Sequence, residues 1–144
     1  MSDRRLAIDA WESLFRAQHE IFAEISADFD ADGLQQAEYD ALLTVTRAPH
    51  DTVRLREITR NMLISQPSVS RLVDRMVEKG LLVKLPDPDD ARSSLVRATA
   101  EGIRQFRAIA ARHARSIADR MSDLTDDELR TLRALTAKLR RHRE

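Results

Sequence analysis

The fold of this chain is decided by residues 55 to 102, which read LREITRNMLISQPSVSRLVDRMVEKGLLVKLPDPDDARSSLVRATAEG. Leu55, Ile58 and Met62 have the spacing of a short helix. A second apolar stripe occupies positions 69, 72, 73, 76 and 77 and predicts a longer helix that ends at Gly80. Two β-prone segments, 81–85 and 94–98, predict a hairpin, because a turn rich in Pro and Asp separates them. The stretch therefore predicts two helices joined by a short turn and followed by a projecting hairpin.

The second of these helices is expected to carry a polar face that bears arginine. Ser65 is a suitable N-cap, Pro67 is tolerated in a first helical turn, and Ser68 can also bond a free amide. Arg71 projects nearly opposite the centre of the apolar stripe, and Arg75 lies nearer its edge. Exposed arginines often form only a solvated face, so this helix does not by itself identify a function.

Helices are also expected on both sides of this stretch. Segments 6–29 and 36–47 have helical apolar spacing, Thr99 is placed to cap a long helix, and Thr125 with Glu128 forms a capping box for a last helix. That last helix is expected to bury Leu129, Leu132, Leu135 and Leu139. Phenylalanines recur at intervals of seven at positions 15, 22 and 29, a pattern that fits an intrachain core as well as a dimer interface. The predicted order is four helices, two strands and two helices.

The composition favours one helical domain. The chain has 144 residues, of which 33% are charged and 4% aromatic, with 3 Gly and 4 Pro, and this profile is typical of a compact, mainly α protein. The absence of cysteine excludes disulfides, thiol catalysis and thiolate metal sites. The sequence has neither the apolar region of a secretory signal nor an apolar run of membrane-spanning length. We therefore expect a cytoplasmic protein without a membrane partner.

Charge is segregated along the chain although the net charge is zero. Residues 53 to 115 hold 13 Lys and Arg against 7 Asp and Glu, whereas residues 1 to 52 hold 4 against 11. A basic block of this kind favours an anionic partner such as nucleic acid. The alternative is a helical interaction module whose basic block docks an acidic protein, which would explain the charges but not the hairpin.

The ordered motifs of residues 55 to 102 resemble the signature of the MarR family of bacterial transcription regulators. They are S-x-P-S-V-S-R-L-V-D-R at the start of the second helix, E-K-G-L at its end, D-x-D-D-x-R in the hairpin and T-x-x-G after it. Two positions depart from the family pattern. Ala98 replaces the usual Leu before Thr99, which is expected to loosen the second strand, and Ala91 replaces an Arg that often follows the hairpin Asp.

The resemblance implies a winged helix-turn-helix at residues 35–100, with dimerisation helices at 1–34 and 101–144 in a single 1–144 domain. It further implies a homodimer that binds a pseudo-palindromic double-stranded DNA operator, acts as a repressor and is relieved by a small anionic or phenolic effector. The hairpin is then the wing. Nothing in the sequence indicates an enzyme or a cofactor, and the four histidines are too scattered for a metal site.

The same resemblance assigns residues to each surface. The second helix of the motif is expected to enter the major groove with its first turns, while Arg75 and Arg54 contact backbone phosphates. Asp90 is expected to hold the side chain of Arg92 in the pose for a minor groove. The expected DNA-binding residues are Arg54, Ser65, Gln66, Ser68, Ser70, Arg71, Arg75, Asp90, Arg92 and Ser93; those of the dimer are Trp11, Leu14, Phe15, Leu129, Leu132 and Leu135; those bordering an effector cleft are Arg16, His19 and Tyr39.

Overall fold

The computed structural model describes residues 3–29, 33–63 and 67–140. Its elements in chain order are α1 (Arg4–Ile25), η1 (Ser26–Phe29), α2 (Gln36–Arg47), η2 (Pro49–Asp51), β1 (Thr52–Arg54), α3 (Leu55–Asn61), α4 (Val69–Glu78), β2 (Leu82–Pro86), β3 (Ser94–Ala98), α5 (Ala100–Arg120) and α6 (Asp126–Arg140). The prediction of a mainly α fold with a small β-hairpin is confirmed.

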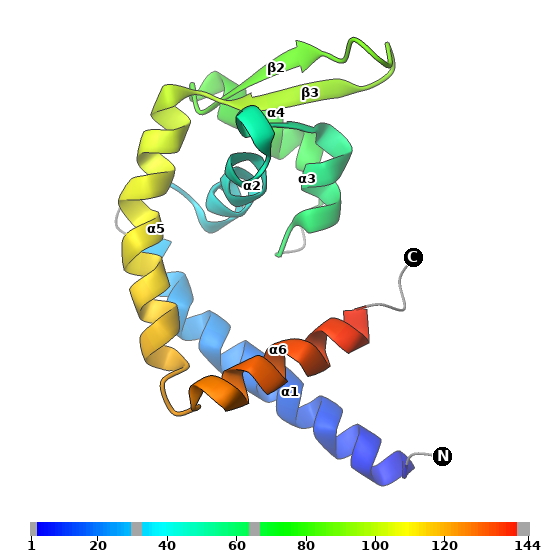
Figure 1. Ribbon diagram of the computed structural model, residues 1–144. Coiled ribbons are helices and arrows are strands. Elements are labelled where there is room, and N and C mark those ends of the chain that lie inside the picture. Colours follow the sequence, from blue (N-terminus) through cyan, green and yellow to red (C-terminus); the bar gives the residue numbers. More distant parts are fainter. Residues whose placement is uncertain (1–2, 30–32, 64–66, 141–144) are drawn as a thin grey trace.

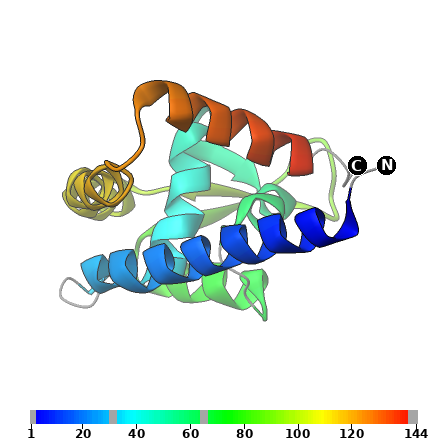
Figure 2. The same cartoon turned by 90° about the horizontal axis from the view of Figure 1, so that it is seen from below.

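The molecule has two parts that α5 connects (Figure 1). The helices α2, α3 and α4 gather with the sheet in the upper part, whereas α1 and α6 cross below them. The view from below in Figure 2 shows α1 and α6 in front with α2 behind them, and in both views their free ends lie away from α5. The helix pair and hairpin of the central stretch thus share one part, and the flanking helices form the other.

The sheet contains a strand that the sequence prediction missed. Its order is β1-β3-β2 and both pairings are antiparallel, with Thr52 opposite Arg97 and Leu82 opposite Ala98. The short β1 follows His50 and Asp51, whose φ angles are 57° and 51°. Three residues cannot display the alternation that identifies a strand, so β1 becomes visible only through its pairing with β3. Ala98 is buried in this sheet despite its small side chain.

The core lies in the upper part, between α2, the two short helices and the inner face of the sheet. The apolar stripe predicted for α4 supplies three of its members, Leu72, Val73 and Met76. These side chains are at most 1% exposed, as are Leu42, Val45, Ile58 and Val96. The core therefore holds α4 by one face and leaves the opposite face in solvent.

Two helix boundaries differ from the sequence prediction. The first helix is α-helical only to Ile25, because the Ser26 hydroxyl donates to the Phe22 carbonyl oxygen at 2.6 Å and the chain tightens into η1. The fourth helix begins at Val69, and its N-cap is Ser68, whose Oγ accepts the Arg71 amide at 3.2 Å. The N-cap assigned to Ser65 was therefore wrong, and Pro67 precedes the helix instead of occupying its first turn.

The prediction that α6 buries its leucines was also wrong for this chain. No residue of α6 is buried, and Leu135 and Leu139 are 54% and 66% exposed. The predicted capping box is present, since the Thr125 amide donates to Glu128 Oε1 at 2.9 Å and the Glu128 amide donates to Thr125 Oγ1 at 3.2 Å. Local capping thus determines where α6 starts, while its apolar face lacks a covering element in the described chain.

A close crossing joins the sheet to α5. The Thr99 amide donates a hydrogen bond to the Leu81 carbonyl oxygen at 3.1 Å. The Thr99 hydroxyl donates to the Gly80 carbonyl oxygen at 2.6 Å and accepts a hydrogen bond from the Gly102 amide at 3.0 Å. A Cβ added at Gly102 would overlap that Leu81 oxygen and stand 3.0 Å from its carbonyl carbon. The T-x-x-G motif therefore encodes a helix cap and a backbone crossing that has no room for a side chain.

Candidate nucleic-acid interface

The exposed face of α4 carries residues predicted for contacts with DNA bases and phosphates. Ser70, Arg71 and Arg75 are exposed, and Ser68 is half-buried at the N-cap. The Ser68 oxygen accepts an amide of the helix, so its hydroxyl hydrogen remains available as a donor. Ser65 and Gln66 lie outside the described residues. The structure thus brings Ser68, Ser70, Arg71 and Arg75 together on the first two turns of one helix.

Two buried carboxylates of α2 bond the chain just after α3 and just after α4, and sequence reasoning missed both. Asp40 on α2 is 3% exposed and accepts the Leu63 amide through Oδ2 at 2.7 Å, just after α3. Glu38, 1% exposed, accepts the Gln35 amide at 2.9 Å and the ammonium of Lys79, beyond the end of α4, at 2.8 Å. Acidic residues inside an apolar helix pattern were the available signal, because buried carboxylates require such partners.

The loop between β2 and β3 is organised by Asp87, which the sequence analysis assigned no role. Its carboxylate is 6% exposed and accepts hydrogen bonds from the Asp89 amide at 2.9 Å, the Ser93 hydroxyl at 2.8 Å and Arg54 Nε at 2.9 Å. The hydrogen bond from the Asp89 amide, followed by that from Ser93, holds the pKa of Asp87 below its usual value. Asp87 thereby ties the base of the wing to β1.

This network changes how Arg54 and Ser93 relate to DNA. Arg54 Nε is bonded to Asp87, and its Nη2 lies 3.9 Å from Asp89 Oδ2. Ser93 donates its hydroxyl to the same Asp87 carboxylate. Both side chains therefore hold the wing in this structure, and their contact with DNA stays a prediction.

The expected pairing of the Asp90 and Arg92 side chains is not what the structure shows. Asp90 Oδ1 accepts the backbone amide of Arg92 at 2.9 Å, and the Ser93 amide donates to the Asp90 carbonyl oxygen at 3.1 Å. The correction follows from turn chemistry, because an Asp side chain readily bonds the amide two residues ahead. Asp90 shapes the turn from which Arg92 projects, and the Arg92 guanidinium is exposed.

The wing and α4 are held next to each other. Lys84 on β2 donates to Asp74 Oδ1 on α4 at 3.1 Å, an exposed ion pair. The predicted helix-turn-helix and wing therefore lie adjacent in the fold, with arginines exposed on both.

The residues predicted for dimerisation lie on α1 and α6 and are largely exposed. Trp11 and Phe15 are 61% and 54% exposed, and their rings stack at a centroid distance of 5.5 Å. A groove of about 480 Å³ runs between the two helices, lined by Leu14, Leu129 and Leu132 among others, whereas Leu135 lies outside it. Large exposed apolar side chains in such a cluster are typical of a protein interface.

The three residues suggested for an effector cleft do not come together. Arg16 and His19 line a hollow of about 340 Å³ on α1 with Trp11 and Phe15. Tyr39 instead packs against Phe106 at a ring distance of 5.0 Å, within an aromatic cluster that also contains Phe29 and His113. Burial raises the pKa of Tyr39, as expected for a phenol in a packed cluster.

Neither a metal-binding group nor a membrane span is found in residues 3–29, 33–63 and 67–140. These residues contain no cluster of three or more His, Asp or Glu side chains arranged to hold an ion. None of their helices combines the length and the apolar character needed to cross a bilayer.

Comparison with known proteins identifies relatives among bacterial regulators. The model of the MarR family matches residues 32–93. The uncharacterized HTH-type transcriptional regulator YkoM of Bacillus subtilis is 30% identical over 131 residues, covering 88% of this chain and 83% of that protein. The HTH-type transcriptional repressor MdtR of the same organism is 27% identical over 139 residues, covering 96% of this chain and 84% of MdtR. The HTH-type transcriptional regulator PecS of Dickeya dadantii is 27% identical over 111 residues. This alignment covers 76% of this chain and 66% of PecS.

Solved structures share the fold over nearly the whole chain. A MarR family regulator from Streptomyces coelicolor, crystallised in complex with DNA, superposes with a TM-score of 0.82 at 20% identity and covers 96% of this chain and 88% of that one. The PcaV regulator from the same organism, in complex with its natural ligand, gives a TM-score of 0.77 at 24% identity with full coverage of both chains. At this level of identity the match describes the fold alone.

Proposed function

Because this chain belongs to the MarR family of transcription regulators, we propose that it is a homodimeric repressor that binds a pseudo-palindromic operator in double-stranded DNA. The observation that carries the proposal is the exposed arginine-bearing face of α4 beside an arginine-bearing wing. Residues 35–100 form the DNA-binding part, and residues 1–34 and 101–144 dimerise. Docking to an acidic protein is the less favoured reading, because it assigns no role to the wing.

In this proposal α4 enters the major groove with its N-terminal end. Ser70 and Arg71 are exposed there and reach base edges, where an Arg fork recognises guanine by two hydrogen bonds. Arg75, one turn later, contacts phosphate and sets the register of the helix on the duplex. Ser65 and Gln66 are proposed to contribute from the segment that precedes the helix. Specificity therefore resides mainly in the first turn of α4.

The wing supplies a second contact through Arg92. Asp87 holds the base of the wing through three hydrogen bonds, and Asp90 holds the Arg92 amide, so the wing backbone is ordered before DNA binds. Arg92 is exposed and inserts its guanidinium into the adjacent minor groove. Arg54 acts mainly through Asp87 and presents only its remaining N–H groups to phosphate.

Dimerisation is supported by the uncovered apolar faces of α1 and α6. Trp11, Phe15 and Leu135 are more than half exposed, and the same helices of a second copy would bury these side chains. Two-fold symmetry in the protein requires two-fold symmetry in the operator, and the half-sites are expected about one helical turn apart. A dimer bound in this way acts as a repressor by competing with RNA polymerase.

Relief by a small ligand is proposed for the hollow around Arg16 and His19. Its stacked aromatic rings suit an aromatic molecule, and among the described residues that line it the Arg16 guanidinium is the one cation for an acidic group, beside the carboxylates of Glu12 and Glu20. Tyr39 does not line this hollow and is proposed to act indirectly, through the packing of its aromatic cluster. The proposal is supported by the solved structure of PcaV, which holds that protein's own natural ligand.

The proposal is tested by selecting binding sites from random duplex DNA and measuring affinity as a function of salt. We expect a palindromic site, and a log-log salt slope of about −0.9 for each phosphate neutralised. Arg71→Ala should relax the base preference, whereas the matched change Arg107→Ala, at an exposed position of α5, should leave it unchanged. No duplex binding even at about 50 mM salt would overturn the proposal, and a selected site without symmetry would overturn the dimer geometry.

A further inference from the structure

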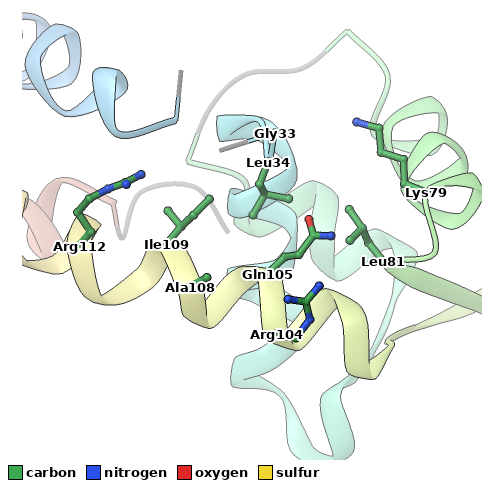
Figure 3. Close-up of a pocket in the computed structure, with 9 residues that line it drawn as sticks. All are labelled: Gly33, Leu34, Lys79, Leu81, Arg104, Gln105, Ala108, Ile109 and Arg112. Atoms are coloured by element: carbon green, nitrogen blue, oxygen red, sulfur yellow. The ribbon is translucent and has the colours of Figure 1, made fainter. Parts of the chain in front are cut away.

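A pocket on the side of α5 lies apart from the DNA-binding face and from the hollow on α1. It has a volume of about 620 Å³ and is lined by residues of three regions: Gly33 and Leu34 before α2, Lys79 and Leu81 between α4 and β2, and five residues of α5. This volume lies in the range of small-molecule sites. Figure 3 shows Lys79 and Arg112 at opposite ends of the pocket with their charged groups turned inward, and Gln105 between them.

The lining of the pocket is cationic. Lys79, Arg104 and Arg112 contribute three positive charges, and the described residues that line it include no Asp or Glu. Its apolar members are almost completely covered by the core, since Leu34, Leu81 and Ile109 are 1%, 2% and 3% exposed. The surface offered to a ligand is more polar than apolar, and its charged groups are an ammonium and two guanidinium groups, which suits an anion better than an apolar molecule.

The protein partners of Lys79 and Arg104 leave capacity for a ligand. Within the described chain the Lys79 ammonium donates only to Glu38, at 2.8 Å, and an ammonium has three N–H groups. Arg104 pairs with Glu101 in an exposed i,i+3 bridge, and bridges of this kind contribute little to stability. A ligand anion can therefore bond Lys79 beside Glu38 and replace Glu101 at Arg104 with little loss of folding free energy.

We propose that this pocket binds a small polyanion, a molecule that bears two or more carboxylate or phosphoryl groups. One acidic group bonds the Lys79 ammonium and another bonds the Arg104 guanidinium, with the Gln105 amide between them. Because Lys79 follows α4 and Arg104 lies on α5, the bound anion would link the DNA-contacting helix to the long helix that leads to α6.

The test uses the full-length protein without DNA, with citrate as the carboxylate probe and inorganic pyrophosphate as the phosphoryl probe. Binding is measured by titration calorimetry at constant ionic strength, and the site is located from amide shifts in NMR spectra. We expect saturable binding of at least one probe, with shifts at Gly33, Leu81 and Ala108. The tighter probe identifies which acidic group the pocket prefers.

Two charge-removing variants on α5 give the matched comparison. Arg104→Gln should weaken binding about tenfold, the effect of losing a charge-assisted hydrogen bond, whereas Arg107→Gln, exposed but outside the pocket, should change it less than twofold. The double change Glu38→Gln with Lys79→Gln removes the ammonium without leaving a buried carboxylate unpaired, and should abolish binding. Circular dichroism verifies that each variant is folded.

Three results would overturn the proposal. They are the absence of saturable binding by both probes, amide shifts confined to α1, and equal losses of affinity in the two arginine variants.

Discussion

Replacing Gly102 by Ala should destabilise the protein, although Ala is the better helix former. Gly102 lies in the first turn of α5, and its amide bonds Thr99 Oγ1 at 3.0 Å. A Cβ at this position would overlap the Leu81 carbonyl oxygen and stand 3.0 Å from the carbonyl carbon and 3.3 Å from Cα. These are backbone atoms, so no side-chain rotation can relieve the overlap, and α5 must move away from the chain that enters β2.

The size of the effect follows from three contributions. Overpacking of this kind costs about 1–3 kcal/mol. The displacement also weakens the 3.1 Å bond from the Thr99 amide to Leu81, at a cost of about 1 kcal/mol. The helix propensity of Ala over Gly returns about 1 kcal/mol. The expected net loss is therefore about 2 kcal/mol, or a fall in Tm of roughly 4–8 °C for a chain of this size.

Urea and thermal unfolding at a fixed protein concentration provide the measurement, because the stability of a dimer depends on concentration. Ala111→Gly, at an exposed position of α5, is the control and should cost only the propensity difference of about 1 kcal/mol. If Gly102→Ala instead raises the stability by that propensity difference, the crossing has room for a methyl group and the steric explanation is wrong.

Five further substitutions test the wing and the dimer. Arg92→Ala should weaken duplex binding and reduce the salt slope by about 1 per protomer without changing stability; unchanged affinity at two salt concentrations would exclude a wing contact. Asp90→Asn keeps an acceptor for the Arg92 amide while removing a charge, so gel shifts should show tighter binding, whereas Asp90→Ala should bind more weakly; equal effects would refute the role of the turn. The pKa of Asp87 is lowered in the folded state, so its ionised form stabilises the protein above about pH 4, and this stabilisation is lost as the pH falls through the lowered pKa. In urea unfolding, the Asp87→Asn variant should therefore be less stable than the parent protein at pH 7. In acid its stability should approach that of the parent protein. Trp11→Ala should weaken the dimer by about 2 kcal/mol, and sedimentation showing an undiminished dimer would count against the α1 interface.

The helices of the central stretch could be predicted because their signals are local. The stripe from Val69 to Val77 repeats over two turns, and Thr99 and Thr125 cap their helices with the predicted bonds. The N-cap of α4 was misplaced because Ser65 and Ser68 are both suitable caps next to Pro67, and local chemistry does not choose between them. The sequence also presented the wing Asp residues as one acidic turn, with no sign of which carboxylate would be buried.

By itself, the sequence determined the positions of the main helices, the hairpin and the arginines on α4, since periodicity, capping and turn residues act within a few positions of each other. The partners of those residues depend on contacts between distant parts of the chain. Arg54 and Asp87 are 33 positions apart and meet because β1 and β2 pair with opposite edges of β3, which places Arg54 and the residue after β2 at the same end of the sheet. Glu38 meets Lys79 because α2 packs against α4. The acidic wing turn was thereby resolved into one buried anchor, Asp87, and one amide acceptor, Asp90. Burial makes these choices, because a carboxylate withdrawn from water requires partners, and the fold brings those partners from distant parts of the chain.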